Sequence, residues 1–184
     1  MKISEADILL IPGYGETSKS HWMYRWQEKM ASAWVVEQKD KIHPIRKVWQ
    51  DTLLARLEKT SRPVVLVGHS LGCIFLAHAA HALPKDKVKG MFLVAPSDWD
   101  RPNLVPGFDG GDFVPIPRHP LGLTTHVVAS QSDPYCEFDT SKALAQSWGA
   151  TFQDAGDAGH ISIDSGHGPW PEGLMSFAHF MKRF

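Results

Sequence analysis

Cysteine, long apolar runs and an excess of one charge are all lacking in this chain of 184 residues. Two cysteines, Cys73 and Cys136, cannot build a disulfide framework. No run of eighteen apolar residues occurs, so no membrane span is expected. A formal net charge of -1 with mixed signs leaves no basic patch, which argues against nucleic acid as a partner. The segment Met1–Asp7 is acidic where a signal peptide needs its apolar stretch, so we expect a cytoplasmic protein.

The pattern that is present is a regular alternation of strands and helices, without internal repeats or linkers. We expect strands over residues 7–11, 33–37, 63–67, 89–95, 124–130 and 151–153. Helices are expected over 20–30, 46–59, 71–83, 139–148 and 171–184. Because the strands are almost continuously apolar, the sequence predicts a mostly parallel sheet of about six strands with helices on both faces. The length indicates a single domain, residues 1–184.

The most informative motif is the pentapeptide Gly68-His69-Ser70-Leu71-Gly72, which follows an apolar strand and opens an apolar helix. Gly-x-Ser-x-Gly in that setting is the nucleophile elbow, in which the serine occupies a tight, strained turn between strand and helix. The alternative is a mere glycine-rich turn. Cys73, three residues further on, is expected to be a small buried packing residue.

A serine hydroxyl needs a base within hydrogen-bond reach and an acid that orients the base. In parallel sheets the reactive groups lie beyond the carboxyl ends of the strands, and the acid and histidine follow the serine in this fold. Asp133 follows the fifth expected strand and His160 follows the sixth. The sequence therefore predicts Ser70 as nucleophile, Asp133 as acid and His160 as base.

Other side chains compete for these roles. The rival acids are Asp154, Asp157 and Asp164, and the rival base is His167, which could instead line the pocket or cap a turn. We expect His69, beside the nucleophile, to be structural because the elbow turns its side chain away from the hydroxyl. His78 and His81 share a helix, but no further metal ligands accompany them, so no metal or cofactor is expected.

Acyl chemistry also needs hydrogen-bond donors for an oxyanion. One should be the backbone N–H of Leu71, the residue after the nucleophile. We expect the second to be the backbone N–H of Tyr14, in the glycine-rich loop Pro12-Gly13-Tyr14-Gly15 after the first strand. A simple turn is the alternative interpretation of that loop.

The longest irregular stretch, residues 96–120, contains Trp99, Phe108 and Phe113 and follows the fourth expected strand. It is expected to roof the site and to favour a small, apolar acyl or aminoacyl group. A packed surface loop without substrate contact is the alternative.

Several motifs give the chain a resemblance that runs nearly from end to end. They are Ile11-Pro12-Gly13, Ser20-His21-Trp22, the elbow, Val94-Ala95-Pro96-Ser97-Asp98, Pro115-Ile116-Pro117, Ser130-Gln131-Ser132-Asp133-Pro134-Tyr135-Cys136, Gly159-His160-Ile161 and residues 165–173. In these the chain resembles the retinoblastoma-binding protein nine-like serine hydrolases, which are small α/β-hydrolases. The resemblance implies an α/β-hydrolase fold without a separate cap domain, ester or amide hydrolysis without a cofactor, and a triad at Ser70, Asp133 and His160.

Binding to retinoblastoma-type proteins is not expected, because that motif, Leu-x-Cys-x-Glu, here reads Leu71-Gly72-Cys73-Ile74-Phe75. The sequence thus predicts a serine hydrolase that cleaves small esters, thioesters or amides. An acyltransferase with the same triad, or a non-catalytic binding or regulatory protein on a hydrolase fold, remains an alternative.

Overall fold

A computed structural model describes residues 1–184 and contains one six-stranded sheet in which all strands are parallel. The strand order is β2-β1-β3-β4-β5-β6. The strands are β1 (Asp7–Ile11), β2 (Ala33–Val35), β3 (Val64–His69), β4 (Val88–Val94), β5 (Thr124–Ala129) and β6 (Thr151–Asp154). The predicted α/β-hydrolase fold is thereby confirmed, with the sheet wholly rather than mostly parallel.

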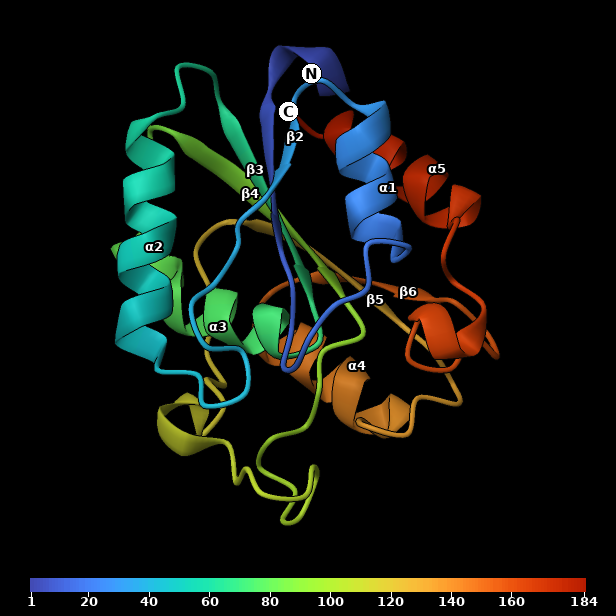
Figure 1. The fold of residues 1–184 in the computed structure, drawn as a ribbon. Helices are drawn as coiled ribbons and strands as arrows, with labels where there is room; N and C mark the ends of the chain where they lie inside the picture. Colours follow the sequence, from blue (N-terminus) through green and yellow to red (C-terminus); the bar gives the residue numbers. More distant parts are fainter.

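Five α-helices cover the two faces of this sheet (Figure 1). They are α1 (Trp22–Lys29), α2 (Arg46–Glu58), α3 (Leu71–Ala79), α4 (Phe138–Ser147) and α5 (Pro171–Met181). One apolar core joins α2, α3 and α4 to one face, and a second core joins α1 and α5 to the other. Residues of β1 alternate between the two cores, with Leu9 and Ile11 in the first and Ile8 and Leu10 in the second. Burial on both faces explains why these strands are apolar at nearly every position.

The ends of several elements differ from the sequence-based expectation for identifiable reasons. Helix α3 ends at Ala79 rather than residue 83 and continues as a 3₁₀ turn, Ala80–Ala82. Pro84 follows, and the residue before a proline avoids the helical region, as the extended conformation of Leu83 shows. Strand β2 ends at Val35 rather than 37, because the neighbouring strand ends at Ile11 and is followed by a proline without an N–H.

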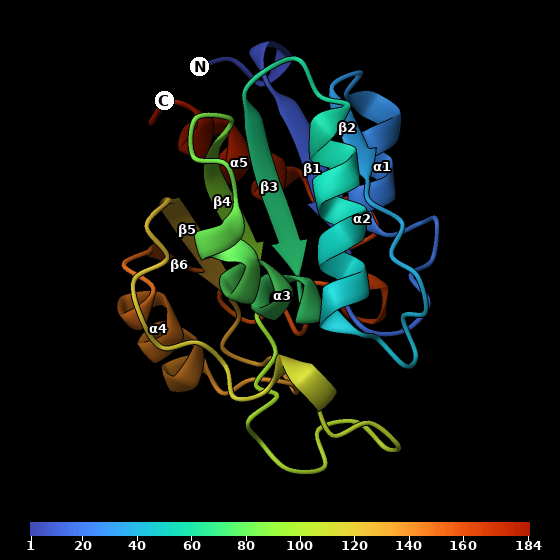
Figure 2. The same ribbon diagram turned by 90° about the vertical axis from the view of Figure 1, so that its left-hand side faces the viewer.

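The carboxyl ends of the strands all meet at one edge of the sheet, opposite the two chain termini (Figure 2). The long segment 96–120 extends beyond this edge, and it contains only one short 3₁₀ turn, Gly111–Phe113 (Figure 2). No helix has the length and apolar character that crossing a membrane requires.

Candidate active site

The elbow serine has the backbone geometry that the sequence predicts. Ser70 lies at φ 55° and ψ −125°, between the end of β3 and the start of α3. A non-glycine residue at positive φ is strained, and such residues gather where function requires them. Here Ala95 and Ile161, next to the same sheet edge, also have positive φ.

Neighbouring segments pack so closely around this turn that the glycines beside it have no room for a side chain. A Cβ on Gly72 would lie 2.3 Å from the carbonyl oxygen of Ile11, and a Cβ on Gly13 would lie 2.8 Å from the Cβ of Ser70. A Cβ on Gly68 would lie 3.0 Å from the backbone nitrogen of Cys73. Glycine at these positions therefore lets β1, β3 and α3 converge beneath the serine.

The Ser70 hydroxyl donates a hydrogen bond to Ser97 Oγ at 3.4 Å. Ser97 is buried and its Oγ also accepts a 2.7 Å hydrogen bond from the indole N–H of Trp99. The hydroxyl of Ser70 makes no hydrogen bond to His160 in this conformation, although both residues line one cavity. Hydrogen bonds between a nucleophile and its base are often formed only once substrate is bound.

Asp133 and His160 form the buried pair predicted from the sequence. His160 Nδ1 lies 2.9 Å from both carboxylate oxygens of Asp133, whose side chain is only 2% exposed. Asp133 Oδ1 also accepts the backbone N–H of Tyr135 at 2.9 Å. Because Nδ1 donates to the carboxylate, the neutral imidazole keeps a free lone pair on Nε2.

Two serines join the loop that carries Asp133 to the loop that carries His160. Ser130 Oγ accepts the backbone N–H of Ala158 at 2.9 Å, and Ser132 Oγ accepts that of Gly159 at 3.0 Å. Between the loops, the backbone N–H of Gln131 also donates to the carbonyl of Gly156 at 2.8 Å. These bonds fix the acid and the imidazole relative to each other.

His69 connects the elbow to the histidine loop. Its Nε2–H donates a 2.9 Å hydrogen bond to the backbone carbonyl of His160, and the indole of Trp22 donates to the next carbonyl, that of Ile161, at 3.0 Å. Burial, assisted by the neighbouring His160 and His21, holds the pKa of His69 well below 6.5. His69 is therefore a neutral hydrogen-bond donor within the fold, which agrees with the structural interpretation.

His21 is a second buried imidazole at this edge, and sequence reasoning gave it no role. Its Nδ1 accepts the backbone N–H of Met23 at 3.3 Å and so caps the start of α1. Its Nε2 is buried without a partner, and its ring centroid lies 4.9 Å from that of His69. Burial, with smaller contributions from His160 and His167, lowers the pKa of His21 to about 4. A histidine between a serine and a tryptophan gave no capping signal, because Ser, Thr, Asp and Asn dominate N-caps.

The backbone N–H groups of the two predicted oxyanion donors have no hydrogen-bond acceptor in the protein. Leu71 is the first residue of α3, so its N–H has no acceptor within the helix. The backbone N–H of Tyr14 makes no hydrogen bond, whereas the next one, that of Gly15, donates to Lys41 at 2.8 Å. The Tyr14 ring is held by stacking on Phe108, with centroids 5.1 Å apart.

A cavity of about 360 Å³ opens over the serine. That volume lies within the range of about 300–1,000 Å³ usual for small-molecule sites. Its only charged linings are Glu16, which pairs with Lys41 at 3.5 Å, and Asp164, which is exposed and has no ionic partner. The lining residues are Gly13, Tyr14, Glu16, Thr17, Ser18, His21, His69, Ser70, Ser97, Trp99, Leu104, Val105, Tyr135, His160, Ser162, Ile163 and Asp164.

Segment 96–120 supplies part of this lining, as expected, but through fewer aromatic rings than the sequence suggested. Trp99, Leu104 and Val105 face the cavity. Phe113 does not, because it is fully buried against the ring of Trp49 at 5.4 Å. Phe108 instead supports the ring of Tyr14.

The rival acids and bases have other partners. Asp154 accepts the backbone N–H of Gly156 at 2.7 Å, and Asp157 accepts the hydroxyl of Ser132. His167 Nδ1 pairs with Ser165 at 3.2 Å, and Asp164 makes no bond to His160. Among the candidate acids, only Asp133 forms a hydrogen bond with the imidazole of His160.

Neither the two helix histidines nor the two cysteines line the cavity over Ser70. His78 Nε2 pairs with the carbonyl of Phe113 at 2.8 Å, whereas His81 Nε2 faces His119 at 3.2 Å. Both thiols are free and buried. Burial raises the pKa of Cys73, and that of Cys136 to about 11.

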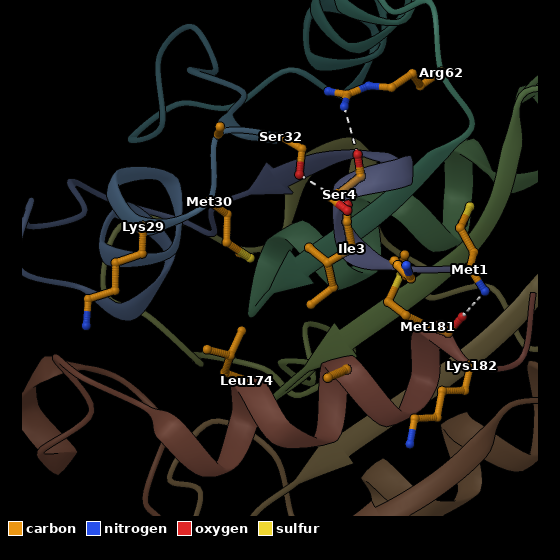
Figure 3. Close-up of a pocket in the computed structure, with 13 residues that line it drawn as sticks. Met1, Ile3, Ser4, Lys29, Met30, Ser32, Arg62, Leu174, Met181 and Lys182 are labelled. Atoms are coloured by element: carbon orange, nitrogen blue, oxygen red, sulfur yellow. Dashed lines mark hydrogen bonds between the residues drawn. The ribbon is translucent and has the colours of Figure 1, made fainter.

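A larger hollow of about 870 Å³ lies at the other end of the molecule, beside the amino ends of β1, β2 and β3 (Figure 3). No acid–imidazole pair or strained serine contributes to it. Size alone would favour this hollow as the active site. The strained serine and the Asp133–His160 pair, however, lie at the carboxyl edge of the sheet.

Comparisons with known proteins identify the family and the fold of the chain. The family model described as serine hydrolase matches residues 8–179. A solved protein described as a YdeN-like hydrolase, from Pectobacterium atrosepticum, is 29% identical, with a TM-score of 0.86 over 98% of this chain and 93% of its own. The ydeN gene product of Bacillus subtilis is 24% identical, with a TM-score of 0.74 over 97% and 99% of the two chains.

A thioesterase from Streptomyces coelicolor, RedJ, is 16% identical with a TM-score of 0.64 over 94% of this chain and 84% of its own, and therefore shares the fold. No curated protein matches the chain at a significant level. The family model covers almost the whole sheet together with the elbow and the Asp133–His160 pair, so the chain belongs to the serine hydrolase family.

Proposed function

We propose that this protein hydrolyses small carboxylic esters, thioesters or amides through an acyl-enzyme formed on Ser70. One observation carries the proposal: a strained elbow serine and a buried Asp133–His160 pair line the same cavity. The three groups come from the ends of β3, β5 and β6, and they meet only because the sheet aligns those ends.

In the proposed acylation, His160 Nε2 takes the proton of Ser70 as Oγ attacks the acyl carbon. The C–O, C–S or C–N bond to the leaving group then breaks, and His160 returns the proton to that group. In deacylation a water molecule gives a proton to His160 and attacks the acyl carbon. The bond between that carbon and Ser70 Oγ then breaks, the acid leaves, and His160 returns the proton to Oγ. Asp133 holds Nδ1–H throughout, so Nε2 stays the basic nitrogen.

The hydroxyl must first exchange partners. In the resting conformation it donates to Ser97, so a rotation about the side chain of Ser70 has to turn it toward His160. The backbone N–H groups of Leu71 and Tyr14 are proposed to hold the oxyanion, because neither has an acceptor in the protein.

The cavity supports a small substrate with a modest apolar group, since Trp99, Leu104 and Val105 line one side. Within the serine hydrolase family we further propose membership of the retinoblastoma-binding protein nine-like group. The motifs around Asp98, residues 130–136 and residues 165–173 support that narrower assignment.

A fluorophosphonate probe tests the nucleophile. We expect the probe to label wild-type protein at Ser70, while Ser70→Ala is not labelled and loses about 10⁴ in kcat on p-nitrophenyl esters. Ser61→Ala is the matched control, because Ser61 is exposed and lies before β3, at the opposite end of that strand.

Near-full turnover by Ser70→Ala, or no labelling of the wild type, would contradict the proposal. A serine that does not react with the probe would favour the alternative of a non-catalytic binding or regulatory protein. Esters of increasing acyl length, assayed beside aminoacyl amides and with added alcohol or thiol acceptors, then define the acyl preference and separate hydrolysis from acyl transfer.

A further inference from the structure

The hollow at the amino ends of the strands has no part in the proposed chemistry, yet its volume exceeds that of the active-site cavity. It lies between the 3₁₀ turn η1 (Ile3–Glu5), the end of α1 and one side of α5, from Leu174 to Lys182 (Figure 3). Its volume of about 870 Å³ is within the range usual for ligand sites.

The floor of this hollow is apolar. Ile3, Met30 and Leu174 are partly buried and pack on the core between the sheet and helices α1 and α5. Met181 is buried beneath them, and Ala178 contributes a small side chain that leaves open space. An aliphatic chain laid here would leave water for apolar surface, which is favourable.

The rim carries charge of one sign only. The charged side chains that line the hollow are Lys2, Lys29, Arg62 and Lys182, and no carboxylate side chain is among them. This is unusual in a chain whose formal net charge is -1. The charge of the hollow is therefore opposite to that of the active-site cavity, where the two charged lining residues, Glu16 and Asp164, are acidic.

Most of this positive charge is unpaired. Arg62 is already engaged, since it bonds Asp7 at 2.8 Å and the carbonyl of Ser4 at 3.0 Å. Those bonds fix η1 against the sheet and so shape the hollow. The ammonium groups of Lys2, Lys29 and Lys182 make no ion pair or hydrogen bond, and Figure 3 shows those of Lys29 and Lys182 extending from either end of the apolar floor.

We propose that this hollow is a binding site for a single-chain amphiphilic anion of the fatty-carboxylate type, separate from the active site. The aliphatic tail lies on the floor formed by Ile3, Met30, Leu174 and Ala178, and the carboxylate faces the lysines of the rim. The assignment does not depend on hydrolytic activity, so a binding assay tests it independently of Ser70.

Isothermal titration calorimetry with dodecanoate, below its micelle concentration, is the direct test. We expect one molecule to bind, with a Kd about tenfold weaker for decanoate, which has two fewer methylenes. Dodecyltrimethylammonium has the same tail and the opposite charge, and should bind at least about tenfold more weakly than dodecanoate. Raising the salt concentration should weaken dodecanoate binding, because the rim charges are exposed.

Two kinds of variant locate the site. Lys29→Gln combined with Lys182→Gln should weaken dodecanoate binding by about fivefold. Ala178→Phe fills the floor and should abolish binding of the tail whatever the head group. Lys142→Gln is the control, because Lys142 is exposed on α4, away from the hollow.

Thermal unfolding first establishes that each variant folds like the wild type. If Ala178→Phe does not fold, the double lysine variant alone locates the site. Equal binding of dodecanoate and dodecyltrimethylammonium, or an equal loss in Lys142→Gln, would overturn the proposal. So would absence of dodecanoate binding, including the case in which the protein binds only phosphatidylglycerol vesicles, since that would identify a membrane-facing surface.

Discussion

The buried imidazole of His21 makes a quantitative prediction about acid stability. With Nδ1 occupied by the N–H of Met23 and Nε2 enclosed by protein, the folded state resists protonation of this ring. Burial, followed by the effects of His160 and His167, lowers its pKa from 6.5 to about 4. In the unfolded chain the same ring titrates near 6.5.

The sign follows from proton linkage. Between pH 6.5 and 4 the unfolded state binds more protons at this position than the folded state, so stability falls as the pH falls. A difference of about 2.5 pK units corresponds to about 3 kcal/mol in full, of which about 2 kcal/mol is lost between pH 7 and pH 5. His69 acts in the same direction, because burial also lowers its pKa.

Urea unfolding at pH 7, 6 and 5 measures this effect, with His21→Asn as the comparison. Asparagine keeps an oxygen that can cap α1 but removes the titrating ring. Other ionisable groups are common to both proteins, so they cancel in the comparison of pH slopes. We expect the wild type to lose about 2 kcal/mol more than the variant between pH 7 and pH 5. Parallel stability profiles would refute the reasoning.

Three further predictions concern the site and the core. Asp133→Asn should keep the far-UV spectrum of the wild type and lose about 10⁴ in kcat, because an amide no longer enforces the Nδ1–H tautomer of His160; wild-type-like turnover would exclude Asp133 as the acid. Cys73 and Cys136 should not react with an aromatic disulfide reagent at pH 8 until the protein is denatured, since both thiols are buried and their pKa values are raised; rapid labelling of the native protein would contradict that burial. Asp164→Asn should improve kcat/KM for an anionic ester by about threefold relative to its neutral isostere, and an unchanged ratio would place Asp164 too far from the substrate.

The fold could be predicted from sequence because burial on both faces leaves an unambiguous pattern. Strands such as 64–67 and 91–94 are apolar throughout, and helical segments separate them. The pairing of Asp133 with His160 was also predictable, since each residue lies in the loop after a strand and parallel strands end at a common edge. Local sequence was enough to predict this pair, because the parallel sheet brings the loops after β5 and β6 together.

Contacts that depend on tertiary packing were not predictable in the same way. Nothing in the residues around Ser97 indicates that its hydroxyl receives both Ser70 and Trp99, because this depends on how β4 ends beside the elbow. The aromatic rings of segment 96–120 look alike in sequence, yet Phe113 enters the core while Trp99 faces the cavity. Phe113 packs against Trp49, which is distant in sequence, whereas the indole N–H of Trp99 bonds to Ser97, two residues before it.

The hydrogen bond from His69 to the carbonyl of His160 has a consequence for how such a protein can diversify. His69, next to Ser70, bonds directly to the backbone of His160, so this hydrogen bond helps to hold two residues together that ninety positions of chain separate. Segment 96–120 lies within that interval and contributes no part of the link. Apart from Ser97, which accepts the Ser70 hydroxyl, and Asp98 and Arg101, which bond to the loop of Asp133, this segment can thus vary and change the cavity lining while Ser70 and His160 keep their spacing.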